Sequence, residues 1–484
     1  MKLAPEGLDV VVGAEVWRYD GGRVLVGGAP TRVLRLSPRA FEFVRDSRVA
    51  ACDPTSRQLA ARLLEAGLAH PDPETLPAVA LDQLTVVIPV LGRSAALQRL
   101  LSGLQGVRVL VVDDGTPEPA ATALHQVVAS AGAELLRLDR NVGPASARNA
   151  GLGQAETPFV AFVDSDVVVT ADALERMLRH FADPELALVG PRVVGTPHPQ
   201  TWIARYENSR ASVDLGIRPA LVRPRSAVSW MSSTCLIGRR EVLAAGFTAG
   251  MRVAEDVDLV WRLCEQGWRV RYEPRVVVEH EHRQRFGPWF RRKLFYGTGA
   301  ADLAPVHPAA IPPAILRPWT IAVLLCLLAA RRWSLPAAAA VSGVAAWRVH
   351  RRLSSTTRSR ALAVRLVGGG VVAALTQASA LALRHWWPIG AVAVLCSRRA
   401  RWIIGIMALA DGLVEYSRLR RGLDPVRFLL ARRLDDIAYG TGVWLGCLRR
   451  RSFRALVPAI VSDRRAGLPL SGKVHRKAGI DGAQ

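Results

Sequence analysis

Residues 159–166 read Phe-Val-Ala-Phe-Val-Asp-Ser-Asp, five apolar residues followed by an acidic turn. An uninterrupted apolar run of this length predicts a strand covered on both faces, as in the sheets of α/β proteins. Alternate residues of an extended segment point to the same side, so Asp164 and Asp166 are expected to face one ligand. Alone, such a pair is more often a simple turn, so its meaning depends on the segments around it.

Strands and helices alternate on either side of this run. The expected elements are strands over residues 85–90, 107–112 and 134–138 and helices over 93–104, 119–131 and from about residue 145. In open parallel sheets, ligands bind beyond the carboxyl ends of the strands, where the acidic turns at 113–116 and 164–166 lie. The pattern predicts a nucleotide-binding α/β domain.

A nucleotide sugar brings a pyrophosphate whose charge has to be neutralised before its anomeric C–O bond breaks. A glycine-rich helix start or a divalent cation held by carboxylates can do this. Neither GxGxxG nor GxxxxGK[ST] follows a predicted strand, so the cation route is indicated. Asp166 is the candidate ligand of Mg²⁺ or Mn²⁺, and Asp164 is the candidate for the ribose or a metal-bound water.

Other polar residues are expected near the nucleotide. Asp113 and Asp114 end a strand and are placed to face the uracil and ribose, although an Asx turn is the alternative. Arg148 can offer a forked donor to a phosphate or to the turn carboxylates, and simple helix packing is its alternative. Pro89, at the end of the 85–90 strand, completes the candidate nucleotide-sugar residues.

Residues 255–263 predict a helix with an acidic first turn. Compensation of the helix dipole is one explanation of those carboxylates. The functional interpretation makes Asp256 the general base that takes the proton from an acceptor hydroxyl. Inversion at the anomeric carbon follows from such a single displacement.

The order of these motifs resembles the family 2 inverting glycosyltransferases of the GT-A fold, over about residues 84–283. The motifs are Val-Ile-Pro at 87–89, Asp-Asp-Gly-Thr at 113–116, the Asn-to-Gly segment 141–151, Asp-Ser-Asp at 164–166 and the acidic segment 255–262. The resemblance implies transfer from a UDP-sugar with Mn²⁺ or Mg²⁺ and Asp256 as base. It also implies a histidine after the next strand, for which His280 is the candidate as a metal ligand or phosphate contact, with His282 or a plain surface role as alternatives.

The acceptor side is less well defined by motifs. Processive relatives carry Gln-x-x-Arg-Trp, and residues 283–292 have arginines and a tryptophan without that spacing, which puts processive synthesis in doubt. The candidate acceptor-side residues are Trp230, Glu255, Arg285 and Trp289.

The first 75 residues predict a small winged-helix-like domain. Strands are expected over 10–17 and 23–28, joined by a turn at Asp20-Gly21-Gly22, and Ser37-Pro38 predicts a helix start. A second helix is expected to begin at Thr55 or Ser56, and a proline-rich linker covers 76–83. The order resembles small peptide-recognition domains of peptide-natural-product pathways, such as that of pyrroloquinoline-quinone assembly.

The net charge of +23 lies in the last third of the chain. Residues 1–310 hold 36 Lys and Arg against 34 Asp and Glu, whereas residues 311–484 hold 28 against 7. The basic residues are interleaved with Leu, Val and Ala, which argues against nucleic-acid binding. Six scattered cysteines indicate neither a zinc site nor a disulfide framework.

The same third is apolar. Of its uncharged runs, only Leu366–Leu383 approaches the roughly 20 residues of a membrane-spanning helix. Buried helices of a soluble domain are one explanation, and short spans or in-plane helices rimmed by arginine are the other. Membrane contact is favoured, and because the N-terminus has no apolar signal segment, the cytoplasmic face is expected.

The predicted organisation is a peptide-recognition-like domain over 1–75, a GT-A domain over 84–300 and a basic, apolar, helical region over 301–484. Together these resemble the glycosyltransferases of the mycofactocin system. That resemblance implies β-linked glucose transfer from UDP-glucose to a peptide-derived redox-cofactor precursor, the mycofactocin precursor. The alternatives are a membrane-bound enzyme acting on a lipid or polysaccharide, and a peptide-binding protein with an inert catalytic domain.

Overall fold

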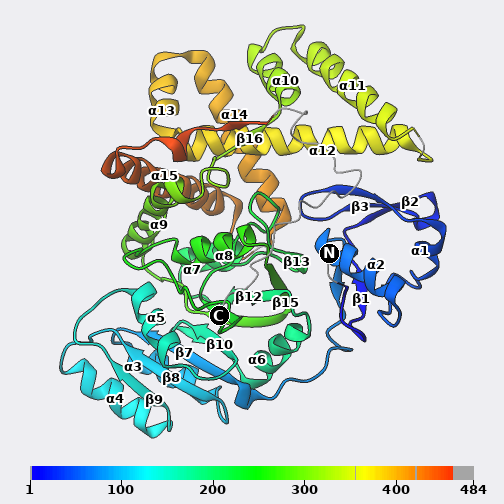
Figure 1. The fold of residues 1–484 in the computed structure, drawn as a ribbon. Helices are drawn as coiled ribbons and strands as arrows, with labels where there is room; N and C mark the ends of the chain where they lie inside the picture. The colour runs from blue at the N-terminus through cyan, green and yellow to red at the C-terminus, as the bar shows by residue number, and fades with distance from the viewer. Residues whose placement is uncertain (1–2, 355, 420–421, 462–484) are drawn as a thin grey trace, which may run out of the picture.

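The computed structural model describes residues 3–354, 356–419 and 422–461. Figure 1 shows a small N-terminal unit beside a large central sheet, with the C-terminal helices gathered beyond α9 (Phe286–Val306) and α15 (Pro425–Arg450). The predicted C-terminal region extends past these residues, and its segment 462–484 lies outside the described chain.

The central sheet is mixed rather than purely parallel. Its strand order is β11-β15-β12-β14-β10-β7-β8-β9, with β13 paired to β15. The strands are β7 (Leu84–Val90), β8 (Arg108–Asp113), β9 (Glu134–Arg137), β10 (Phe159–Val163), β11 (Val167–Val168), β12 (Leu186–Gly195), β13 (Ala220–Leu221), β14 (Cys235–Arg239) and β15 (Arg269–His280). Strands β10, β7, β8 and β9 run parallel, as predicted, whereas β14 is antiparallel to both β10 and β12.

Helices cover both faces of this sheet. They are α3 (Ser94–Ser102), α4 (Ala120–Ser130), α5 (Pro144–Gln154), α6 (Ala171–Leu178), η3 (Arg179–Ala182), α7 (Trp202–Arg210) and α8 (Glu255–Glu265). Val86 and Ile88 of β7 belong to the core with α3, α4 and α6, whereas Val87 belongs to the core with α5 and α8. The strand is therefore buried on both faces, and the predicted alternation of strands and helices is confirmed for residues 84–163.

The N-terminal unit contains two small sheets. Its elements are β1 (Val10–Val12), β2 (Trp17–Tyr19), η1 (Asp20–Gly22), β3 (Val24–Gly27), β4 (Arg32–Arg35), α1 (Pro38–Glu42), β5 (Arg48–Val49), α2 (Pro54–Glu65) and β6 (Ala69–Pro71), followed by η2 (Leu81–Gln83) in the linker. The predicted 10–17 strand is divided, because β1 pairs with β5 and β6 while β2 pairs with β3.

Helix starts in this unit follow the side chains that cap them. Ser37 accepts from the Ala40 N–H at 3.1 Å, as its predicted role requires. The second helix instead begins at Pro54, because Asp53 accepts from the Thr55 N–H at 2.8 Å and from the Ser56 N–H at 3.2 Å. The expectation that Thr55 or Ser56 caps this helix was wrong by two or three residues.

Helices α9 and α15 pack against each other through glycines. A Cβ on Gly297 would lie 2.1 Å from the Tyr439 carbonyl, and one on Gly442 would lie 1.9 Å from the Leu294 carbonyl. Such close approach of two backbones requires residues without side chains. Helix α15 is thereby joined to the catalytic sheet through α9, and the predicted boundary at residue 300 falls inside α9.

The remaining C-terminal elements, called the C-terminal layer, lie beyond α9 and α15, and some of them pack on these two helices (Figure 1). They are β16 (Ile315–Leu316), α10 (Pro318–Ala329), α11 (Ser334–Arg352), α12 (Ser359–Ala380), η4 (Leu381–His385), α13 (Trp387–Cys396), α14 (Arg398–Arg418), η5 (Arg454–Leu456) and β17 (Ala459–Ile460). The continuous helix Ser359–His385 has 27 residues and a mean hydropathy of 1.7, enough by length and composition to cross a membrane. Only 17% of its apolar window is buried. The N-terminal β2–β3–β4 sheet packs on this layer through Val24, Val26, Leu353 and Leu362.

Candidate active site

The acidic turns meet at one edge of the sheet because β7, β8 and β10 run parallel. Asp164 and Asp166 follow β10, Asp113 ends β8, and half-buried Pro89 lies near the end of β7, paired with Val112. This is the edge at which open α/β sheets bind ligands. The predicted clustering of these turns is therefore observed.

Arg148 of α5 lies at the centre of the site. Its guanidinium donates to Asp164 Oδ1 at 2.6 Å and to Glu255 Oε1 at 3.0 Å, and it lies over the Phe247 ring at 5.3 Å. Burial would lower the pKa of Arg148, but the charges of Asp164 and Glu255 outweigh burial and raise it. Of the roles considered from the sequence, the structure shows the guanidinium on the turn carboxylate of Asp164 and, in addition, on Glu255 of α8.

Asp256 is the second residue of α8, and backbone donors hold its carboxylate. The Ser233 N–H donates to its Oδ2 at 3.2 Å, and the Val257 N–H donates to its Oδ1 at 2.8 Å. The side chain is only partly buried. Burial and then the neighbouring Glu255 charge raise its pKa from 3.8 to about 7, against the effect of these donors and of Arg148. A base with a pKa near neutrality is suited to accept a proton at physiological pH.

Asp166 and His280 converge from different strands. The Asp166 Oδ1 lies 3.6 Å from the His280 Nε2, because Val167 of β11 pairs with His280 of β15. His280 Nδ1 in turn lies 3.3 Å from His282 Nδ1. His282 is buried, and burial and the neighbouring His280 lower its pKa to about 3, so its imidazole is neutral.

The donor chemistry of Asp166 and His280 fits a divalent cation whose remaining ligands come from a nucleotide and water. Within the described residues, no group of three or more His, Cys, Asp and Glu side chains forms a complete metal site. Mg²⁺ is commonly bound through one or two carboxylates plus substrate phosphates, so an incomplete protein ligand set is compatible with it.

The side chains of Asp113 and Asp114 point into the protein interior rather than toward solvent. Asp113 accepts from the Thr116 N–H at 2.9 Å and lies 3.0 Å from His125 Nε2. Asp114 accepts from the Val142 and Gly143 N–H groups at 2.7 and 3.0 Å. Asp113 thus closes its own turn and contacts α4, in keeping with the turn alternative, whereas Asp114 holds the 142–143 loop that leads into α5. A contact of either carboxylate with uracil or ribose stays a prediction.

The four predicted acceptor-side residues are dispersed. Glu255 is buried against Arg148, Arg285 is exposed at the start of α9, and half-buried Trp230 lies three residues before Ser233, the donor to Asp256. Trp289 is 2% exposed, and its Nε1 donates to Glu207 Oε1 at 2.9 Å within the cluster formed with Tyr206 and Phe428. The indole packs between α7, α9 and α15, so a role on the acceptor side would be indirect and stays a prediction.

Sequence reasoning missed three arginines near the acidic turn. Arg93 binds the Asp166 carboxylate. Burial lowers the pKa of Arg292, but Tyr296 and then the charges of Asp164 and Asp166 raise it overall, which places Arg292 close to both carboxylates. Arg283 is the third. Arg93 could have been found from the sequence by its positive charge, because it lies three residues after Val90, where the predicted strand ends.

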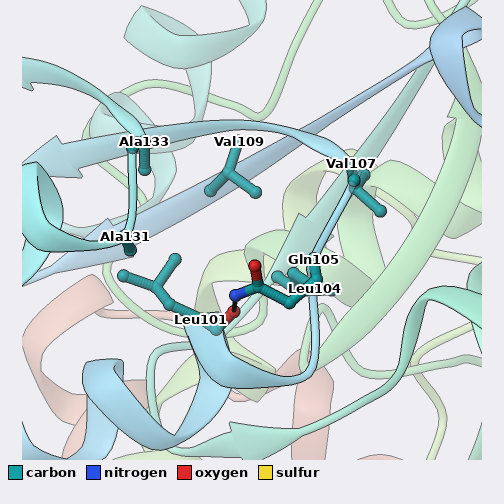
Figure 2. Close-up of a pocket in the computed structure, with 9 residues that line it drawn as sticks. Leu101, Leu104, Gln105, Val107, Val109, Ala131 and Ala133 are labelled. Carbon is teal, nitrogen blue, oxygen red and sulfur yellow. Dashed lines mark hydrogen bonds between the residues drawn. The ribbon is translucent and has the colours of Figure 1, made fainter.

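Two hollows lie away from the acidic turns. Figure 2 shows the first, of about 160 Å³, between Leu101, Val107, Val109 and Ala133 at the beginning of β8, the end opposite Asp113. The second, of about 370 Å³, lies between the loop that leads into α8 and the ends of α9 and α15, and its lining includes Met251, Asp302 and Arg450. The first hollow is remote from the candidate catalytic groups, whereas the second adjoins the loop before Asp256.

Comparison with known proteins agrees with this geometry. Residues 85–247 match the model of glycosyl transferase family 2, and the fold and site define the protein as a glycosyltransferase of that family. The pre-mycofactocin glycosyltransferase of Mycobacterium tuberculosis (strain ATCC 25618 / H37Rv) is 38% identical over 465 residues, covering 94% of this chain and 98% of that protein. The chain belongs to the family of pre-mycofactocin glycosyltransferases.

More distant relatives share only part of the chain. The poly-beta-1,6-N-acetyl-D-glucosamine synthase of Staphylococcus aureus (strain COL) is 23% identical over 232 residues, covering 46% of this chain and 56% of that protein. A solved mannosyltransferase from Pyrobaculum calidifontis, in complex with GDP-Man and Mn²⁺, gives a TM-score of 0.38 at 20% identity, covering 63% of this chain and 88% of that one. This structural likeness is too low to assign a site.

Proposed function

We propose that the protein transfers glucose from UDP-glucose to the mycofactocin precursor, with inversion, building a β-linked oligoglucoside. The observation that carries the proposal is Asp256, a partly accessible carboxylate of pKa about 7 next to the Arg148–Asp164 pair. Membership of the pre-mycofactocin glycosyltransferase family supports the acceptor.

The reaction requires one proton transfer and one displacement. Asp256 takes the proton of the acceptor hydroxyl while that oxygen attacks the anomeric carbon, and the bond from this carbon to the UDP oxygen breaks. The Ser233 and Val257 N–H groups hold the base in position. Arg148 holds the Asp164 carboxylate in place through a charge-assisted hydrogen bond.

Mg²⁺ or Mn²⁺ is the proposed cofactor, held by Asp166 and His280 together with the donor diphosphate. When bound, the ion neutralises charge on the leaving diphosphate. Asp164, Asp113, Asp114 and Pro89 are proposed to shape the nucleotide pocket. Asp113 would do so by closing the turn after β8, and Asp114 by holding the loop before α5. Asp113 and Asp114 thus keep a proposed role in nucleotide binding, but as residues that support the pocket rather than contact the nucleotide.

The N-terminal unit is proposed to act in peptide recognition next to the catalytic sheet. Its Glu65 accepts from Arg223 at 2.9 Å, and its His70 contacts Arg271 of β15 at 3.3 Å. Since β15 ends at His280, this unit rests on the strand that carries the candidate metal ligand.

The C-terminal layer is proposed to attach the enzyme to the cytoplasmic face of the membrane. Large apolar side chains on α10–α14 are exposed, namely Leu325, Leu335, Trp347, Val364, Val372, Ile389, Val392, Leu395, Trp402, Ile406 and Leu409. Exposed apolar surface on a soluble protein, where it is extensive, marks sites that contact a membrane or a partner. Arginines at the helix ends, such as Arg351 and Arg398, are suited to anionic headgroups.

This exposed layer also favours a second candidate function, transfer to a lipid or a growing polysaccharide. A donor and acceptor screen by mass spectrometry separates the two. Purified protein with Mn²⁺, UDP-glucose and precursor is expected to add hexose masses to the precursor. Addition only to a lipid or polysaccharide acceptor would favour the second function, and no addition from any nucleotide sugar would exclude both.

A further inference from the structure

Arg93 is placed over the active-site edge by an unusual loop. Its φ is 58°, in the left-handed region that residues other than glycine seldom adopt. The preceding Gly92 N–H donates to Thr116 Oγ1 at 2.9 Å, which ties the loop to the turn after β8. A backbone conformation of this kind persists where neighbouring structure determines it.

The Arg93 guanidinium binds the Oδ2 atom of Asp166, whose other oxygen faces His280. A positive charge therefore already lies on the carboxylate proposed to hold the divalent cation. The Arg93 side chain is 49% exposed, so it can leave Asp166 without disturbing the core.

Two further arginines lie near this edge of the sheet. Arg292 stacks on the Tyr296 ring at 4.7 Å and is within electrostatic reach of Asp164 and Asp166. Partial burial lowers the pKa of Arg283, and so does the like charge of Arg292. The charge of Arg93 lowers it further. Three guanidinium groups thus lie near Asp164 and Asp166, and guanidinium groups bind phosphate oxygens through forked hydrogen bonds.

We propose that Arg93 takes the place of the divalent cation on Asp166 in the ligand-free enzyme and passes to the donor diphosphate when the metal and nucleotide bind. The exchange leaves neither Asp166 nor the diphosphate without a cationic partner. It rests on the proposed function, because it requires the metal and the nucleotide to share this edge.

The exchange predicts effects of opposite sign in Arg93→Gln. Without nucleotide, Mn²⁺ affinity is expected to rise about threefold, because a competing, half-exposed ion pair has been removed. At saturating Mn²⁺, UDP affinity is expected to fall about tenfold, because a charge-assisted bond to phosphate has been lost. Uridine affinity is expected to stay unchanged. Isothermal titration calorimetry measures all three, and Mn²⁺ paramagnetic resonance checks the first independently.

Arg99→Gln is the matched control. Arg99 lies on α3, directly after the Arg93 loop, and donates to the exposed Glu281 at 2.8 Å, so this change removes the same charge from the same surface. It is expected to leave both affinities unchanged. An equal rise of Mn²⁺ affinity in Arg99→Gln would overturn the proposal, since general electrostatics would then explain the effect.

Arg93→Lys provides a second variant that keeps the charge. It is expected to retain wild-type Mn²⁺ affinity while losing UDP affinity, because an ammonium cannot fork to a diphosphate. An unchanged or weakened Mn²⁺ affinity in Arg93→Gln, in a wild type that binds Mn²⁺ and UDP and turns over, would overturn this inference alone. A wild type that binds neither ligand would overturn the proposed function as well.

Discussion

Arg148 and Asp164 are joined by a hydrogen bond of 2.6 Å that connects the start of α5 with the acidic turn after β10. The same guanidinium reaches Glu255 at 3.0 Å, next to the proposed base. Three motifs that are distant in the sequence therefore meet at one buried cation. The predictions below depend on this arrangement.

Replacing Arg148 should destabilise the fold as well as the site. Arg148→Ala leaves Asp164 and Glu255 without their cation, and breaking a buried pair in this way costs about 3–5 kcal/mol. Urea unfolding should show the loss. Arg176→Ala, which removes an exposed i,i+4 partner of Asp172, should change stability by less than about 0.5 kcal/mol and serves as the control. Equal effects in the two variants would contradict the central position of Arg148.

The proposed base makes activity dependent on pH. Since burial and the Glu255 charge raise the pKa of Asp256 to about 7, kcat/KM should increase as the pH rises toward 7 and level off above it. Asp256→Asn should lower kcat by about 10²- to 10⁴-fold. Steady-state rates over pH 5–9 test both statements, with Asp172→Asn as a matched surface control. A variant that kept its rate would exclude Asp256 as the base.

Ionisation of Asp256, which should raise activity as the pH increases, should at the same time lower the stability of the fold. Its folded-state pKa of about 7 exceeds the unfolded value of 3.8, so the folded protein binds more protons between these pH values. The contribution of Asp256 to stability should consequently fall as pH rises from about 4 to about 7. Asp256→Asn should be more stable than the wild type by up to about 4 kcal/mol above pH 7 and equal to it below pH 4. Thermal unfolding at pH 4 and pH 8 measures the difference, and a larger gain at pH 4 would contradict the sign.

Removal of the metal should abolish transfer. Chelation with EDTA is expected to stop turnover, and added Mn²⁺ or Mg²⁺ should restore it. Asp166→Ala should remove Mn²⁺ binding, and His280→Ala should weaken it about 10- to 100-fold. His198→Ala, an exposed histidine outside the site, should bind Mn²⁺ like the wild type. Full turnover in EDTA would contradict the cation route.

The C-terminal layer should bind membranes through exposed apolar side chains. Leu335→Ser on α11, combined with Trp402→Ser on α14, should reduce co-sedimentation with vesicles that contain anionic lipid. Ile217→Ser provides the control, because Ile217 is 72% exposed, as Leu335 is, but lies in the catalytic domain. Equal losses for both changes, or no binding by the wild type, would contradict membrane attachment through this layer.

The sequence by itself determined the parallel core and the positions of the acidic turns. Apolar runs of five to seven residues between amphipathic helices specify β7, β8 and β10, because burial on both faces is a local property of composition and period. Parallel pairing then brings Asp113 and Asp164 to one edge.

The tertiary structure alone decided which of the predicted site residues are already bound to other protein groups and which remain available to a ligand. Asp114 is occupied by backbone groups of the 142–143 loop, Trp289 by Glu207, and Asp166 by Arg93, and each of these partners lies at least 28 residues away in the sequence. The physical reason is that periodicity specifies which face of an element is buried. The partner of a buried carboxylate, in contrast, depends on which distant segment closes over it.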